Sequence, residues 1–216
     1  MLLRNNRPNR VFDSLTKDEH KIYERLSTPA KIQDFLDSLE MNFSEKDPCF
    51  SPRDVLQKRK AHCMEGALLA AAALWYHGHK PLLLDLTTTS NDEDHVVTLF
   101  KVNGCYGAIS KTNHAVLRYR EPVYKTVREL VMSYFHEYFL SSSGQKTLRT
   151  YSNPFDLSKF SYLNWLTSRD GILDLIDEMA HSPHKQILNR EQIKNLRKAD
   201  KIEIQAGKLV EWKRRK

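Results

Sequence analysis

The pattern of apolar and polar positions begins with helical segments. Between residues 15 and 40, apolar side chains recur at helical spacing and Pro29 interrupts them, which predicts two short helices. A Ser-Pro-Arg-Asp start predicts a third helix over about 52–59. From 63 to 77 nearly every residue is apolar. That composition is typical of a helix buried on all sides.

Strand-like apolar runs follow this buried helix. The last two of them flank Asn103-Gly104, a dipeptide that strongly favours a two-residue hairpin turn. Helices followed by an antiparallel sheet form an α+β pattern, with the Cys-headed helix packed on the sheet. The predicted strands cover 82–86, 96–102 and 105–109, and the later predicted helices lie at 124–139, 170–180 and 189–199.

A Ser-Ser-Ser-Gly stretch at 141–144 is the clearest linker signal in the chain. It predicts two parts. Residues 1–140 form the core with its N-terminal helices. Residues 141–216 form a C-terminal extension, helical with a terminal hairpin at Gly207, packed on that core.

Composition narrows the class of protein. The chain has 216 residues, 40% of them apolar, and neither an apolar run long enough to cross a membrane nor an apolar signal-peptide core. Its three cysteines, an odd number, argue against a disulfide framework, so we expect a cytoplasmic protein with reduced thiols. We expect no cofactor and no metal, because the histidine pairs at 77/79 and 181/184 lack further ligands. The oligomeric state stays open.

The net charge of +7 is concentrated in three basic clusters. A basic protein can attract nucleic acid. However, no aromatic residues interleave with the clusters, as they would on a nucleic-acid platform, so solvated tails are the favoured interpretation and a nucleic-acid partner is disfavoured. The clusters are Arg4, Arg7 and Arg10, then Lys58-Arg59-Lys60, then Lys213-Arg214-Arg215-Lys216.

Cys63 is the leading candidate for chemistry. It stands where a basic stretch gives way to the apolar helix, and a thiol at a helix N-terminus is shifted toward the thiolate by the helix dipole. His95 opens a strand 32 residues later and could pair with it as a catalytic base. The alternative is a small buried cysteine without a chemical role.

The order of these elements resembles the transglutaminase-like superfamily. The resemblance covers about 50–115, from the Ser51–Cys63 segment through Gly78-His79-Lys80-Pro81 and Asp94-His95-Val96-Val97 to Gly104–Ile109. It implies a papain-like fold and a Cys–His–Asp triad that acts on an amide or peptide through a thioester. Cys63 would be the nucleophile and His95 the base. At the spacing of the usual Asp, this chain has Ser110.

Two residues compete for the third position. If the hairpin turn sits at 103–104, Val97 faces Ser110 and His95 faces Thr112, so Ser110 is a diagonal neighbour of His95 that needs a bridging water. Asn113 would serve instead if the chain bends after the strand. Gln57, six residues before Cys63, has the spacing of the oxyanion-hole glutamine of papain-like enzymes, although an exposed surface role is also open.

Three functions therefore remain in competition. The first is a cysteine hydrolase or acyltransferase. The second is a weak or inactive relative that serves as a binding module, because Ser110 replaces the usual Asp. The third is a basic nucleic-acid-associated protein.

Overall fold

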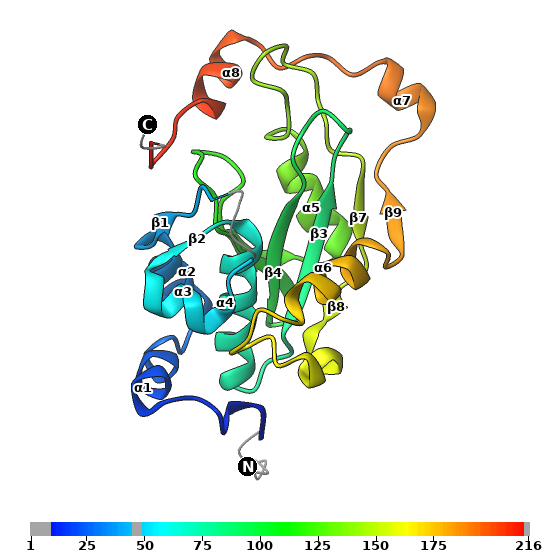
Figure 1. The fold of residues 1–216 in the computed structure, drawn as a ribbon. Coiled ribbons are helices and arrows are strands. Elements are labelled where there is room, and N and C mark those ends of the chain that lie inside the picture. Colours follow the sequence, from blue (N-terminus) through cyan, green and yellow to red (C-terminus); the bar gives the residue numbers. More distant parts are fainter. Residues whose placement is uncertain (1–9, 45–48, 214–216) are drawn as a thin grey trace.

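A computed structural model describes residues 10–44 and 49–213 of the chain (Figure 1). Arg4, Arg7 and the basic residues 214–216 lie outside the described residues. In the remaining basic cluster the cations lie over aromatic rings. Lys58 Nζ and Lys60 Nζ are 5.4 and 5.6 Å from the centre of the Phe50 ring, and the Arg59 guanidinium is 4.5 Å from that of Phe35.

The N-terminal part consists of helices that form where the sequence predicts them. Thr16, Thr28 and Ser51 cap the first three α-helices by accepting a hydrogen bond from a first-turn backbone N–H. A short parallel strand pair brings the chain back just before the buried helix. The elements are η1 (Arg10–Phe12), α1 (Lys17–Arg25), α2 (Pro29–Asp37), β1 (Glu40–Met41), α3 (Pro52–Lys58), β2 (Lys60–Ala61) and α4 (Cys63–Tyr76).

An antiparallel sheet forms the centre of the molecule, in the order β6-β5-β4-β3-β7-β9, with β8 also pairing with β3. Asn103 and Gly104 both have positive φ, as the predicted hairpin turn requires, and Val102 pairs with Cys105. The strands are β3 (Leu82–Thr87), β4 (His95–Val102), β5 (Cys105–Ile109), β6 (Arg120–Tyr124), β7 (Thr150–Ser152), β8 (Phe155–Asp156) and β9 (His184–Gln186).

Helices cover both faces of this sheet. On one face α4 packs against β4, with Val96 and Phe100 in the same core cluster as the helix. On the other face Val97 and Leu99 pack with α5 (Val127–Phe135). Because neighbouring residues of β4 point to opposite faces, one strand contributes to both cores. The α+β prediction, with the Cys-headed helix on an antiparallel sheet, is confirmed.

The C-terminal part differs from the prediction of a helical extension. Strands β7, β8 and β9 join the central sheet, so the part after 141 completes the sheet. The prediction of a terminal hairpin at Gly207 is wrong, because Asp200 caps a helix whose last residue is this glycine. The other elements here are η2 (Leu157–Leu163), α6 (Ile172–Ala180), α7 (Arg190–Lys194) and α8 (Lys201–Gly207). Within the described ranges, no helix is both long and apolar enough to cross a bilayer.

Candidate active site

Cys63 is the first residue of α4 and lines a cavity of about 540 Å³. Glu65, in the first turn of the helix and fully buried, fixes this start. Its carboxylate accepts hydrogen bonds from the backbone N–H groups of His62 (2.8 Å) and Phe50 (2.9 Å) and from the Asn42 side-chain amide (3.0 and 3.1 Å to its two oxygens). One carboxylate therefore ties three chain segments together around the thiol.

The protonation state of Cys63 differs from the prediction. The helix N-terminus predicts a lowered pKa, but burial raises the pKa of the thiol by more than the Val96 and Met64 backbone N–H groups lower it. The carboxylates of Glu93 and Glu65 raise it further. At neutral pH the resting group is therefore a neutral thiol.

His95 lines the same cavity as Cys63 and is buried at the start of β4. Its Nε2 lies 2.8 Å from the Ser110 hydroxyl oxygen. The prediction of a water-bridged contact is wrong because pairing of β4 with β5 stops at Thr98–Ile109, and the chain then leaves the sheet. The bend brings Ser110 directly onto the imidazole.

The hydroxyl of Ser110 fixes the tautomer of His95. A serine has one O–H, and the Ser110 oxygen lies 2.5 Å from the Leu117 carbonyl oxygen, which can only accept a hydrogen bond. Ser110 therefore donates to Leu117 and accepts from His95, so Nε2 carries the imidazole proton. Nδ1 is left with its lone pair, as a base requires. Burial lowers the pKa of His95 to about 4, and His114 adds to this effect, so the resting imidazole is neutral.

Leu117 presents its carbonyl from an uncommon backbone conformation, with φ of 61°. Such a conformation in a residue other than glycine is strained and must be held by its surroundings. Here the Leu117 N–H donates to Glu137 at 2.6 Å, and Arg120 in turn donates to the same carboxylate at 2.6 Å. The acceptor for the Ser110 hydroxyl is thus anchored to the end of α5.

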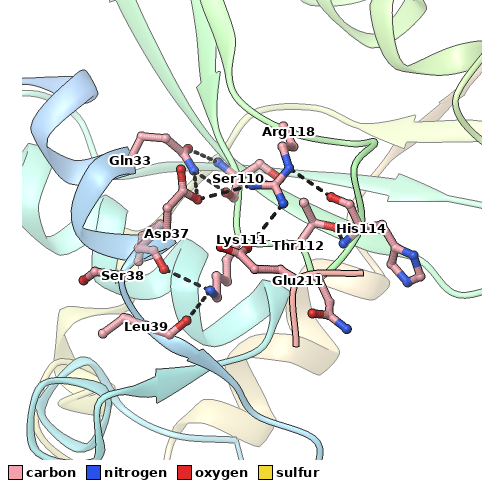
Figure 2. A network of polar contacts seen from close by, with 12 residues as sticks. Gln33, Asp37, Ser38, Leu39, Ser110, Lys111, Thr112, His114, Arg118 and Glu211 are labelled. Atoms are coloured by element: carbon pink, nitrogen blue, oxygen red, sulfur yellow. Dashed lines mark hydrogen bonds and ion pairs between the residues drawn. The ribbon is translucent and has the colours of Figure 1, made fainter. Parts of the chain in front are cut away.

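Two side chains, neither singled out by the sequence, hold the chain at Ser110 and Lys111 (Figure 2). Gln33 of α2 accepts from the Ser110 N–H at 3.0 Å and donates to the Ser110 carbonyl at 2.8 Å. Lys111 is buried, and its ammonium group donates to the carbonyl of Leu36 (2.9 Å), in the last turn of α2, and to that of Leu39 (2.6 Å), just beyond the helix. No sequence pattern signals either residue, because their partners are more than 70 residues away.

Close packing joins the Lys111 segment to the start of α4. A Cβ atom built on Gly66 of α4 would lie 2.5 Å from the Lys111 Cβ, well inside contact distance. Glycine at this position therefore lets the Ser110–Lys111 segment cross the first turn of α4, the helix that begins at Cys63.

The structure does not bring the two other predicted residues into contact with the pair. The Asn113 side chain forms two hydrogen bonds with the Trp212 backbone, donating to its carbonyl at 3.0 Å and accepting from its N–H at 2.8 Å. It lines the cavity but anchors the C-terminal segment. Gln57 is exposed on α3 and is not among the residues that line the cavity, so it does not supply an oxyanion donor in this structure.

Acidic side chains border the cavity although the protein is basic overall. Asp92, Glu93 and Asp94 come from the loop between β3 and β4. Asp92 accepts a hydrogen bond from Thr147, and Asp94 accepts from the Thr88 N–H, so both are fixed in place. The approach to the thiol is therefore negatively charged.

The sequence profile of a protein family described as a transglutaminase-like domain matches residues 14–131, which is more than half of the chain. The chain therefore belongs to the transglutaminase-like family. The matched region contains Cys63, His95 and Ser110, whereas Glu137 and the C-terminal strands lie beyond it. No curated protein matches the chain in a sequence comparison.

Proposed function

We propose that this protein is a cysteine-dependent acyl-transfer enzyme, a hydrolase or acyltransferase that acts on an amide or peptide through a thioester on Cys63. The observation that carries the proposal is the hydrogen bond from His95 Nε2 to Ser110 in a cavity that His95 shares with the thiol. It leaves Nδ1 of the imidazole unprotonated, and a base that is oriented by a third residue is the usual support of a nucleophile.

The pair starts uncharged in this mechanism, because burial opposes both the thiolate and the imidazolium. The S–H proton of Cys63 passes to His95 Nδ1 as the sulfur attacks the carbonyl carbon. Collapse of the tetrahedral intermediate breaks the C–N bond, and the imidazolium returns its proton to the leaving amine. Water or a second amine then attacks the thioester and regenerates the thiol.

One donor for the developing oxyanion follows from helix geometry. The first N–H groups of a helix have no acceptor within the helix, and Cys63 occupies the first position of α4. Its backbone N–H is thus placed to bind a carbonyl oxygen under attack at the same residue.

The activated ester p-nitrophenyl acetate provides the test. We expect an acetyl thioester on Cys63, found by mass spectrometry and removed by hydroxylamine, followed by slow turnover. Cys63→Ala should abolish formation of this thioester. His95→Asn should slow its formation by about 100-fold or more, the usual contribution of a general base. Cys105→Ala is the matched control and should acylate like the wild type.

A binding module is the second candidate, and the Ser110 hydroxyl favours it. A neutral hydroxyl stabilises imidazolium far less than the usual carboxylate does, so the charged intermediate is poorly supported. Acylation of Cys63 no faster than that of Cys105, and insensitive to His95→Asn, would contradict the enzyme and favour the binding module.

A further inference from the structure

A second cluster of metal-ligating side chains lies next to the nucleophile. The donor atoms of Cys49, His62 and Glu65 all lie within 4.8 Å of one another. They come from three places in the chain, namely the segment before α3, the N-cap of α4 and the first turn of α4. The expectation of no metal rests on the histidine pairs at 77/79 and 181/184, and it does not cover this set, which only the fold brings together.

We propose that Cys49, His62 and Glu65 form a binding site for a thiophilic divalent cation of the Zn²⁺ class. The donors are one sulfur, one imidazole nitrogen and one carboxylate oxygen, a set that suits Zn²⁺ or Co²⁺ and excludes the hard cations Mg²⁺ and Ca²⁺. Three protein ligands leave the fourth position of a tetrahedral ion open to water.

The spacing of the donors fits such an ion. His62 Nε2 lies 3.4 Å from Glu65 Oε1, longer than an ordinary hydrogen bond. Nitrogen and oxygen ligands at about 2.0–2.1 Å from a tetrahedral zinc are separated by about 3.3 Å, and nitrogen and sulfur ligands by about 3.6 Å. The Cys49 sulfur, within 4.8 Å of both other donors, needs to move by little more than about 1 Å.

Glu65 has an electrostatic reason to accept a cation. The carboxylate is fully buried, and the hydrogen bonds it accepts come from neutral groups, the amides of Asn42, Phe50 and His62. A buried carboxylate is stabilised best by a full positive charge close by. The Asn42 amide donates to both carboxylate oxygens and can stay on Oε2, so Oε1 can bind the ion through one lone pair while it keeps the Phe50 N–H at 2.9 Å on the other.

The position of the cluster determines both how an ion reaches it and what a bound ion does to the fold. His62 lines the same cavity as Cys63, so an ion can enter from that cavity. Once bound, it would clamp the segment before α3 to the start of α4. The site would therefore act as a structural clamp beside the nucleophile, with or without the proposed chemistry at Cys63.

Cobalt titration of a Cys63→Ser background tests the site, because Co²⁺ reports a thiolate ligand by a charge-transfer absorption and the background removes the nucleophile thiol. We expect one equivalent of Co²⁺ to produce that absorption and Zn²⁺ to displace it. Adding Cys49→Ser should abolish it, whereas adding Cys105→Ser should leave it unchanged. Zn²⁺ should also raise the melting temperature of the background, and not that of its Cys49→Ser form.

Two results would overturn the site. One is the absence of thiolate absorption at saturating Co²⁺, and the other is an absorption that survives Cys49→Ser. If Cys49→Ser does not fold, His62→Gln replaces it in the titration. That variant keeps the Cys49 thiol and should weaken Co²⁺ binding. An unchanged affinity for Co²⁺ would contradict the proposal. Acylation of Cys63 by the ester is measured separately, so either proposal can fail without the other.

Discussion

The Cys63 side and the His95 side of the cavity are each organised by a buried charged side chain. Glu65 sits at the N-terminus of α4 and gathers N–H donors from three segments. Lys111 sits beyond the C-terminus of α2 and gathers carbonyl acceptors. Each charge has the sign that the neighbouring helix end favours.

The difference between the two sides lies in how far along the chain each anchor reaches. Glu65 binds the N–H of His62, three residues away, as part of a capping box. Its other partners, Phe50 and Asn42, are 15 and 23 residues away. Lys111 binds Leu36 and Leu39, which are 75 and 72 residues away. The Cys63 side is thus held by contacts over at most 23 residues, whereas the His95 side depends on contacts over more than 70 residues.

The largest loss of stability should follow removal of the Glu65 carboxylate. Glu65→Leu leaves the buried donors of Asn42, Phe50 and His62 without an acceptor, so we expect a loss of about 3–5 kcal/mol in the free energy of unfolding. Urea denaturation measures it. Glu178→Leu, at an exposed carboxylate of α6, is the control. A loss below about 1 kcal/mol would show that Glu65 does not hold this side.

Removal of the buried Lys111 ammonium should lower the free energy of unfolding by less. Lys111→Met keeps the length of the side chain but leaves the Leu36 and Leu39 carbonyls without this donor, and we expect a loss of about 2–3 kcal/mol. Lys185→Met, at an exposed lysine of β9, should change stability by less than about 0.5 kcal/mol. Equal effects of the two lysine variants would contradict the comparison.

His95 should make stability depend on pH. Its pKa in the folded protein is about 4, below the ordinary value of 6.5, so the unfolded chain binds the proton more readily. The resulting stability is fully present above about pH 6.5 and is lost as the pH falls toward 4. Between about pH 7.5 and 5 the wild type should lose about 2 kcal/mol more than His95→Asn in urea denaturation. Parallel losses in the two proteins would show that the imidazole is not buried as a neutral group.

The smallest effect should be a change in the alkylation rate of Cys63 when a charge on the acidic border of the cavity is removed. Glu93 is exposed, so its field at the thiol is weakened by solvent. Iodoacetate, an anion, should alkylate Cys63 more slowly than neutral iodoacetamide. Glu93→Gln should narrow that rate ratio by about twofold, the scale of an exposed charge. A ratio that stays the same at Cys63 in this variant would place the charge too far from the thiol to matter.

Periodicity and capping residues are enough to predict α1 to α4 and the β4–β5 hairpin, because those elements depend on local sequence. The nearness of Ser110 to His95 was predicted through the wrong geometry, since sheet pairing was extended past the residue where β5 ends. Gln33 and the C-terminal strands were missed because their partners are distant in sequence and no local pattern marks them. The lowered thiol pKa was predicted from one helix end, without the burial that opposes it.

The contact of Gln33 with the Ser110 backbone has a consequence for how the protein folds. It joins residues 77 positions apart, so it closes a long loop and cannot form until the α2 region and the sheet have come together. The helix that carries Cys63 needs no such closure to begin. During folding Cys63 should therefore be in place before His95 is oriented, and native reactivity at Cys63 should be among the last properties to appear.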